Sequence, residues 1–430
     1  MEPKKFLFVS IDGLITDIVW QVLKEGHKVK YFIEDKDEKE VGDGFVSKVE
    51  NWEEEVDWSD IIIFDDVLGQ GKKAQKLRSE GKLVVGGTPY TDKLEDDRAF
   101  GQQELKNAGV SIIPQENFTS FDDAISYVQE NPNRYVIKPS GEAQNLKQLL
   151  FVGEDEDGKD VIQVLEDYKV AWSKKIKEFQ LQRRILGVEV ATGAFFNGKE
   201  FVHPIHVNFE HKKLFPGDIG PSTGEMGTSA FFSEPNKIFN ATLKKMEPKL
   251  AEEGYVGYID INNIVNAYGI WPLEWCARFG YPTISIQQEG MITPVGEFLY
   301  GLAEGNLTKF KERSGFQVGV RIVVPPFPFK DKQTFESNSK DAVIIFKKPN
   351  RDGVHIEDVK NVDGEWLVTG TSGVVLIVVG MGPTMRAAQK QAYARIDNVM
   401  IPNMYYRKDI GDRWYEDSDR LHNWGYLREV

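Results

Sequence analysis

Short apolar runs alternate with helical patterns through the first hundred residues. Helical spacing of apolar residues covers 16–25 and 72–80. The apolar runs between these segments, which predict strands, cover 6–11, 28–33, 61–64 and 83–85. Strands separated by helices indicate a parallel, doubly wound sheet. Because ligands bind beyond the carboxyl ends of such strands, the Ser-Ile-Asp-Gly turn at 10–13 is a candidate site, with an ordinary turn as the equal alternative.

The middle of the chain changes to shorter, mixed elements. Ser120, followed by Asp123 three residues later, is a capping-box-like start that predicts a helix. Further helices are predicted at 96–107 and 161–177, and strands at 110–114, 135–138, 149–153, 179–185, 188–196 and 201–209. The stretch 210–227 is rich in glycine and proline and is longer than an ordinary connection. Such a loop in a compact domain favours a functional role.

The last third predicts a small α+β unit. Apolar runs at 317–324, 342–346, 366–370 and 373–380 predict strands. A helix capped by Thr384 then runs to about residue 399.

Composition limits the classes of function. With 430 residues, the chain is long enough for two to four domains. It has 67 acidic residues against 53 lysines and arginines, which argues against a nucleic-acid or anionic-membrane binder. Any phosphate must therefore be bound locally. The lone cysteine, Cys276, excludes an internal disulfide and suits a reducing cytoplasm. Neither a cleavable signal nor a membrane-spanning apolar run is found, so we expect a cytoplasmic protein.

The strongest candidate chemistry lies at 258–282, where two β-runs flank an Asn-Ala-Tyr-Gly turn. Asp260 and Glu274 fall on these runs and are expected to face each other across an antiparallel pair, with Arg278 four residues further on. Carboxylates are the hard oxygen ligands that Mg²⁺ prefers, and a guanidinium suits phosphate. An ordinary surface hairpin is the alternative.

Four dispersed segments together resemble the phosphoribosylamine-glycine ligase family of the ATP-grasp superfamily. They are GPSTGEMGT (220–228), EWCARFGYP (274–282), GMGPTMRAAQKQAYARIDNV (380–399) and YRKDIG (406–411). The resemblance implies an ATP-grasp fold of α/β and α+β units. It places an N-terminal Rossmann-like domain at 1–105, the ATP-grasp domain at 106–315 with its smaller lobe at about 115–185, and a C-terminal α+β domain at 316–430.

The same resemblance implies a reaction. ATP, with Mg²⁺ or Mn²⁺, phosphorylates the glycine carboxylate, and 5-phosphoribosylamine displaces phosphate to form an amide in purine biosynthesis. The implied partners are these small molecules, with no nucleic acid and no membrane, and the chain is expected to be a monomer or weak homodimer.

Site roles carried over from the family fall into four groups. The catalytic residues are Arg278 and Lys138. Cofactor binding falls to Arg98, Lys138, Lys147, Gln182, Arg183 and Glu189, with the backbone of 180–183 meeting adenine. Substrate binding falls to Gly220, Pro221, Ser222, Thr223, Gly224, Glu225, Met226, Gly227, Lys212 and Arg278. The metal ligands are Glu274 and Asp260.

Several positions depart from the family pattern where substrate is handled. The family's glycine-rich phosphate loop is replaced by Ser-Ile-Asp-Gly-Leu-Ile-Thr at 10–16, which puts binding of the phosphoribosyl group in doubt. Cys276 stands where the family has a metal-binding asparagine, and Glu225 and Tyr281 replace a glycine and an aspartate. Two alternatives remain open: a ligase for another amino acid and amine, and a nucleotide-binding relative without activity.

Overall fold

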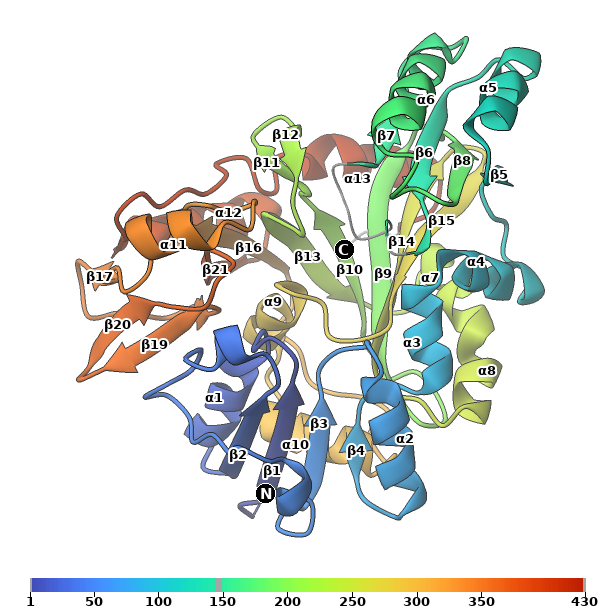
Figure 1. Ribbon diagram of the computed structural model, residues 1–430. Coiled ribbons are helices and arrows are strands. Elements are labelled where there is room, and N and C mark those ends of the chain that lie inside the picture. Colours follow the sequence, from blue (N-terminus) through green and yellow to red (C-terminus); the bar gives the residue numbers. More distant parts are fainter. Residues whose placement is uncertain (1, 142, 144–148, 428–430) are drawn as a thin grey trace.

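The computed structural model describes residues 2–141, 143 and 149–427. Figure 1 shows the chain around one central sheet, with the N-terminal sheet below it and a small lobe above it. None of the helices found in the described part of the chain is both long and apolar enough to cross a membrane.

The N-terminal unit is a parallel sheet, as the alternating pattern predicts. Its strands are β1 (Lys5–Ser10), β2 (Lys28–Ile33), β3 (Ile61–Phe64) and β4 (Val84–Val85), in the order β2-β1-β3-β4. The first connection is α1 (Thr16–Lys24) and the third is α2 (Gln70–Ser79). The chain crosses from one side of β1 to the other between β2 and β3, so the switch point of this sheet lies between β1 and β3.

The central sheet has eight antiparallel strands and extends into the C-terminal part of the chain. In spatial order they are β15 (Gly269–Cys276), β14 (Val256–Asn266), β9 (Val188–Asn197), β10 (Ile205–Glu210), β13 (Gly227–Ser233), β16 (Phe316–Val323), β21 (Val374–Gly382) and β18 (Val354–Ile356). Strands before and after the predicted boundary at 315/316 therefore share one sheet. The division into 1–105, 106–315 and 316–430 stays a prediction.

The small lobe is a four-stranded antiparallel sheet with helices on one face. Its strands follow the order β5 (Gln115–Phe118), β8 (Phe179–Arg183), β6 (Tyr135–Pro139) and β7 (Phe151–Val152). Helices α5 (Phe121–Glu130) and α6 (Lys159–Ala171) cover a core that includes Ile137 and Leu181. The Ser120 Oγ accepts a hydrogen bond from the Asp123 amide at 3.2 Å, so the predicted cap of α5 is confirmed.

The remaining elements surround these three sheets. Before the central sheet lie the 3₁₀ turns η1 (Lys36–Glu38) and η2 (Glu53–Glu55), and the helices α3 (Pro89–Asp96) and α4 (Arg98–Asn107). Along it lie β11 (Lys213–Phe215), β12 (Ile219–Ser222), α7 (Lys237–Ala241), η5 (Leu243–Met246), α8 (Glu247–Glu252), α9 (Thr283–Gly290) and α10 (Val295–Ala303). The C-terminal part adds α11 (Lys332–Asn338), β17 (Ile345–Phe346), β19 (Val359–Val362), β20 (Glu365–Val368), α12 (Met385–Ile396), β22 (Val399–Met400) and α13 (Trp414–Asn423).

Two local predictions need correction. The apolar run 110–114 is not a strand: Val110 and Ile113 are buried as an irregular segment, and the polar residues after it form β5 by pairing with β8. The predicted loop 210–227 contains the hairpin of β11 and β12. In both cases long-range pairing decides the strand, which local hydrophobicity does not report.

Candidate functional site

Four adjacent strands of the central sheet bring a group of oxygen-bearing side chains around one ammonium group. Lys212, just after β10, places Nζ 2.8 Å from Glu274 Oε1 on β15, 3.1 Å from Glu189 Oε1 on β9 and 3.4 Å from Glu210 Oε2 on β10. Asn262 on β14 donates to Glu189 Oε1 at 2.8 Å. We call the side chains of Glu189, Glu210, Asn262 and Glu274 the oxygen-ligand cluster of the central sheet.

The charge of Lys212 sets the ionisation of this group. Burial opposes the ammonium charge, but Glu274, Glu189 and Glu210 raise the pKa of Lys212 well above its ordinary value. Lys212 in turn lowers the pKa of Glu274 to about 2, with Lys138 and Arg98 adding to the effect. Glu274 is therefore a carboxylate at any physiological pH, as a metal ligand must be.

Two further cations approach from the small lobe and its entry helix. Lys138 lies on β6, and Arg98, the first residue of α4, donates from Nη1 to the Pro139 carbonyl at 3.1 Å. Burial, together with the charge of Arg98, lowers the pKa of Lys138 to about 8. The structure thus brings Lys138, Arg98 and Glu189, which are predicted to bind ATP, close to the predicted metal ligand Glu274 and the predicted substrate-binding Lys212. These roles stay predictions.

Alternation along β8 separates the predicted adenine-binding residues. Gln180 pairs with Lys138 across β8 and β6, so Gln180 and Gln182 share the face that bears Lys138. Arg183 belongs to the opposite face, where its side chain lines a hollow with Leu181 and Tyr135. Only the backbone of Arg183 is placed to serve a ligand near Lys138. Lys147 lies outside the described residues.

The register of the metal hairpin differs from the expectation. Glu274 pairs with Asn262, and Asp260 pairs with Cys276. The prediction that Asp260 and Glu274 lie directly opposite each other is therefore wrong by two residues. The two carboxylates share a face on a diagonal, because a bulge between Asn262 and Asn263 fixes the register. Burial and the charge of Glu210 raise the pKa of Asp260 well above its ordinary value.

The donor atoms of this face suit a divalent cation. Asn262 Oδ1 is buried without a hydrogen-bond partner, and Glu274 and Glu189 supply ionised oxygens beside it. Among the described residues, no three His, Cys, Asp or Glu side chains form a ready metal cluster, and the Lys212 ammonium lies between the carboxylates. Mg²⁺ prefers such oxygens, whereas burial and Asp260 raise the pKa of the Cys276 thiol and keep it neutral.

The predicted substrate loop is partly structural. Thr223 donates from its amide to the Lys212 carbonyl at 2.8 Å, and the Met226 amide donates to the His211 carbonyl at 2.8 Å. Met226 is fully buried, and a Cβ on Gly227 would lie 2.5 Å from the Gly319 carbonyl oxygen. Thr223 and Met226 therefore fix the backbone at 211–212, and Gly227 allows the close approach of β16. Gly220, Pro221, Ser222 and Gly224 are at least partly exposed.

Glu225 faces the inner end of the site. Its carbonyl accepts from Arg321 Nη1 at 2.8 Å, and its Oε1 is buried without a partner. Burial and the charge of Glu210 raise the pKa of Glu225 well above its ordinary value. Arg321 itself is paired with Glu357, Nη2 to Oε1 at 2.6 Å, so its charge is already compensated.

Arg278 is held by two carboxylates of the N-terminal part of the chain. Its Nε is 3.1 Å from both Glu95 Oε1 and Asp66 Oδ1, which tie it to α3 and to the end of β3. Burial opposes its charge, but Glu95 raises the pKa of Arg278 well above its ordinary value. Arg278 therefore joins the central sheet to the edge of the N-terminal sheet.

Sequence reasoning missed Glu210, Glu95 and Asp66. Glu210 ends a run with polar residues at every second position, His206, Asn208 and Glu210, and this alternation could have identified it as part of β10. Glu95 and Asp66 carry no local signal, since only the fold brings α3 and the residues after β3 to Arg278.

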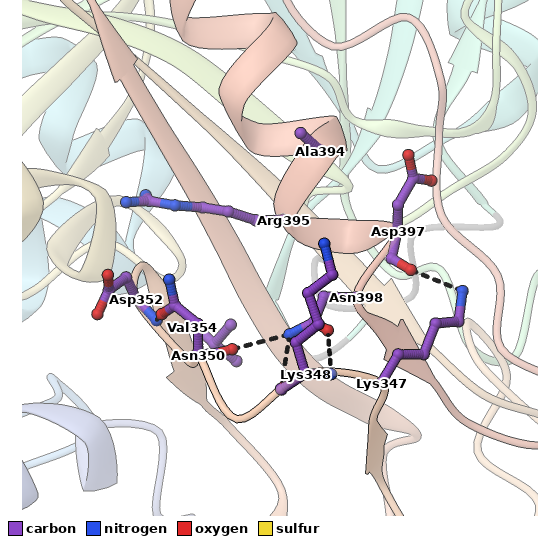
Figure 2. Close-up of a pocket in the computed structure, with 9 residues that line it drawn as sticks. All are labelled: Lys347, Lys348, Asn350, Asp352, Val354, Ala394, Arg395, Asp397 and Asn398. Carbon is purple, nitrogen blue, oxygen red and sulfur yellow. Dashed lines mark hydrogen bonds between the residues drawn. The ribbon is translucent and has the colours of Figure 1, made fainter.

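A separate hollow of about 260 Å³ lies in the C-terminal part of the chain (Figure 2). Its lining includes Lys347, Lys348 and Arg395, and Lys347 Nζ donates to the Asp397 carbonyl at 2.6 Å. None of the predicted site residues lines it, and several of its polar groups bond to one another.

Comparison with known proteins gives the same family for two parts of the chain. Residues 96–284 match the family model for the phosphoribosylglycinamide synthetase ATP-grasp (A) domain, and residues 332–413 match the model for the C domain of the same synthetase. Together the two matches span more than half of the chain.

Curated relatives agree. A phosphoribosylamine–glycine ligase of Lactococcus lactis is 26% identical over 344 residues, covering 77% of this chain and 78% of the relative. The enzyme of the same name from Halalkalibacterium halodurans is 26% identical over 353 residues, covering 79% and 78%.

Solved structures show the same fold. A phosphoribosylamine–glycine ligase of Thermotoga maritima superposes with a TM-score of 0.70 at 20% identity, covering 94% of this chain and 100% of that one. The biotin carboxylase domain of Hydrogenobacter thermophilus 2-oxoglutarate carboxylase, solved with MgADP and bicarbonate, superposes with a TM-score of 0.65 at 13% identity over the full length of both chains. The fold and the two matching domain models place this chain in the phosphoribosylglycinamide synthetase family of ATP-grasp proteins.

Proposed function

We propose that the protein is an ATP-dependent carbon–nitrogen ligase that joins glycine to 5-phosphoribosylamine. The γ-phosphoryl group of ATP passes to a glycine carboxylate oxygen, which releases ADP and gives an acyl phosphate. The amine nitrogen then attacks the acyl carbon, phosphate leaves, and the nitrogen loses a proton. The products are glycinamide ribonucleotide, ADP and phosphate, a step of purine biosynthesis.

The observation that carries this proposal is that Lys138 and Arg98 lie close to the oxygen-ligand cluster of the central sheet. Phosphoryl transfer requires positive charge around the moving group and carboxylates that hold a divalent cation near it. Lys138 and Arg98 supply the first, and Glu274 and its neighbours supply the second.

Each residue has a defined part in this scheme. Lys138 and Arg98 bind the ATP phosphates, and the backbone of 180–183 and the Glu189 carboxylate bind the nucleoside. Mg²⁺ or Mn²⁺, held by Glu274 with Asn262 and Asp260 nearby, would neutralise charge on the phosphates. Lys212 bridges the three carboxylates and compensates their mutual repulsion in the free protein. Glu95 and Asp66 hold Arg278, which orients the amine substrate.

Calorimetry of Mg-ATP binding, run beside an assay of ADP formation, tests the class of function. We expect binding of Mg-ATP, with ADP formed only when both the amino acid and the amine are present. Binding without turnover for any acid and amine would instead identify a nucleotide-binding relative that has no activity.

A second candidate keeps the chemistry and changes the pair of substrates. The loop after β1 carries Asp12 where the family has a phosphate loop, and Glu225 replaces a glycine within the predicted substrate segment. These residues favour another amino acid or amine. Small-molecule substrates follow from either version, and we propose a cytoplasmic monomer or weak homodimer on the basis of the lone cysteine and the acidic surface.

A further inference from the structure

One buried histidine lies where three parts of the chain meet. His355, on β18 in the C-terminal part, is 6% exposed. Its Nδ1 lies 2.8 Å from Oδ2 of Asp17, which belongs to the first turn of α1. Its Nε2 lies 3.3 Å from Oε1 of Glu289 on α9. The imidazole ring therefore lies between a carboxylate of the N-terminal unit and a carboxylate of the helix that follows the metal hairpin.

This geometry favours a ring that is protonated at both nitrogens. Each ring nitrogen of His355 faces a carboxylate oxygen, and a neutral imidazole carries only one N–H. In the neutral form, either Asp17 or Glu289 would therefore face a nitrogen lone pair. Asp17 is 3% exposed, and a buried carboxylate without a compensating charge is costly. The imidazolium offers a proton to Asp17 and an ion pair to Glu289.

The neighbouring amide of Gln288 allows one alternative. Gln288 Nε2 lies 2.6 Å from His355 Nδ1 and also donates to Asp17 Oδ2. A neutral Nδ1 could accept a hydrogen bond from this amide. Its lone pair would then also face the Asp17 oxygen at 2.8 Å, where two acceptors repel each other. The short contact between the ring and Asp17 thus favours the imidazolium.

The charges around the ring favour the same state. Burial opposes the charge of His355, but Asp17 and Glu289 raise its pKa to about 9. Burial also opposes the charge of Asp17, but His355 lowers the pKa of that carboxyl below its ordinary value. Lys24 at the end of α1 and Arg395 on α12, whose Nη1 is 3.9 Å from Glu289 Oε2, are the other charged groups here.

On one side, Asp17 connects His355 to the loop 10–16. Asp17 Oδ1 accepts a second hydrogen bond from the Ile356 amide at 3.1 Å, so the C-terminal part holds the start of α1 at two points. The hydroxyl of Thr16, the first residue of α1, donates to the Gly13 carbonyl at 2.6 Å. The position of α1 therefore fixes the loop 10–16, which stands where the family has its phosphate loop.

On the other side, α9 begins directly after the segment 278–282. The Tyr281 hydroxyl of this segment lies 3.4 Å from Asp65 Oδ2, and Ser10 of the loop 10–16 donates to the same oxygen at 2.6 Å. The loop and the segment thus adjoin at Asp65. The helices that continue from them, α1 and α9, adjoin at the ring of the buried histidine.

We propose that His355, protonated at both ring nitrogens, is a positioning residue for the amine substrate. It holds α1 and α9 in one fixed relation, so that the loop 10–16 and Arg278 present a single surface to 5-phosphoribosylamine. His355 acts through Asp17 and Glu289 rather than by contact with the substrate. This inference deepens the proposed function and rests on it for the identity of the amine.

Steady-state kinetics of His355→Gln test the positioning role. The variant keeps a hydrogen-bond donor for Asp17 and removes the charge. We expect KM for 5-phosphoribosylamine to rise by about tenfold. KM for ATP should change by less than about twofold, because Lys138 and Arg98 lie on β6 and α4, away from this contact.

Two further variants sharpen this comparison. Glu289→Gln changes a carboxylate whose side chain is 25% exposed, so it is the milder variant should His355→Gln fail to fold. It should raise KM for the amine by about threefold. His203→Gln, at a half-buried histidine whose pKa is lowered by burial, is the matched control and should change neither KM.

NMR of the ring nitrogens of His355 measures its protonation without any substrate. We expect both nitrogens to be protonated at neutral pH and the ring to titrate at a pH of about 9. In Glu289→Gln the titration should move to lower pH, because one of the two carboxylates that stabilise the charge is gone. A ring that is neutral at neutral pH would overturn the inference, whatever the activity of the protein.

The outcomes separate the inference from the proposed function. Glycinamide ribonucleotide formed by the unmodified protein, with an unchanged KM for the amine in His355→Gln, would overturn the inference and leave the proposed function standing. An equal rise in KM for the amine and for ATP would also overturn it, because it would indicate a general loosening of the fold. No glycinamide ribonucleotide from the unmodified protein would reject the proposed function, and the inference with it.

Discussion

The two ends of the site differ in how far nearby cations compensate the charges of their carboxylates. At the central sheet, Lys212 lies within 3.4 Å of three carboxylates, and Lys138 and Arg98 stand close by. At the edge of the N-terminal sheet, Asp12 and Asp65 lie near Arg278, whose charge is already shared between Asp66 and Glu95. The first end is balanced in charge and fits the chemistry of the family. The second end is unbalanced and departs from it.

This contrast separates the reaction from the choice of substrate. Phosphoryl transfer depends on the balanced end, where the fold keeps the positions of charged residues on rigid strands. We propose that the choice of the acceptor depends on the unbalanced end, where loops after β1 and β3 carry the side chains. Loops are the part of a fold in which residues change most readily without loss of the core.

The largest expected effect is at the balanced end. Glu274→Ala should lower kcat by about a thousandfold or more, because it removes the carboxylate that holds the divalent cation near the phosphates. The side chain of Glu274 is 56% exposed, so the melting temperature should change little. Steady-state ADP release and thermal unfolding measure the two. Activity close to that of the unchanged protein would remove Glu274 from the mechanism.

The buried ion pair of Arg321 and Glu357 should instead affect the stability of the fold. Arg321→Met leaves Glu357 buried without its partner and should lower the free energy of unfolding by about 3–5 kcal/mol. Urea unfolding measures this change. The double variant Arg321→Met with Glu357→Leu should recover much of the loss. Equal instability of the single and double variants would show that packing, not the unpaired charge, is responsible.

The pH dependence of ATP binding should report on Lys138. Its pKa of about 8 means that the ammonium form is lost as the pH rises through 8. ATP binds the ammonium form, so affinity should be constant below this pH and fall by up to about tenfold per pH unit above it. Calorimetry from pH 6.5 to 9.5 measures the profile, with Lys138→Met as the control that should flatten it. A profile of the same slope in Lys138→Met would assign the titration to another group.

The smallest expected effect is at Cys276. Cys276→Asn restores the oxygen ligand that the family has at this position and should raise affinity for Mg²⁺ or activity by about a few fold. The site is adjacent to Asp260 in the hairpin, so the amide oxygen would lie on the same face as Glu274. Titration of Mg²⁺ against ADP formation measures the change. A fall in Mg²⁺ affinity would show that the thiol is the better fit for this site.

Local patterns predict the parallel N-terminal sheet well, because each buried strand there is a continuous apolar run such as 61–64. They also predict the capped helices after Ser120 and Thr384, where the side-chain oxygen accepts a hydrogen bond from the backbone amide three residues later. The strand at 115–118 is missed, since it is polar and forms only through pairing with β8.

The candidate site shows the same division. Lys138, Glu189, Lys212 and Glu274 come together as the family resemblance implies. The hairpin register is not predictable from spacing alone, because a bulge of one residue sets Glu274 opposite Asn262 and leaves Asp260 on the diagonal of the same face. Glu38 and Asp358 lie more than 300 residues apart in the sequence, and only the fold brings their carboxylate oxygens to Gly370.

We propose that this chain uses ATP to form an amide. Mass spectrometry of a reaction with ATP, Mg²⁺, glycine and 5-phosphoribosylamine is the most direct test. We expect glycinamide ribonucleotide in amounts equal to the ADP released, and no product when ATP is omitted or in Glu274→Ala. ADP released without any amide, whichever amino acid and amine are offered, would contradict it.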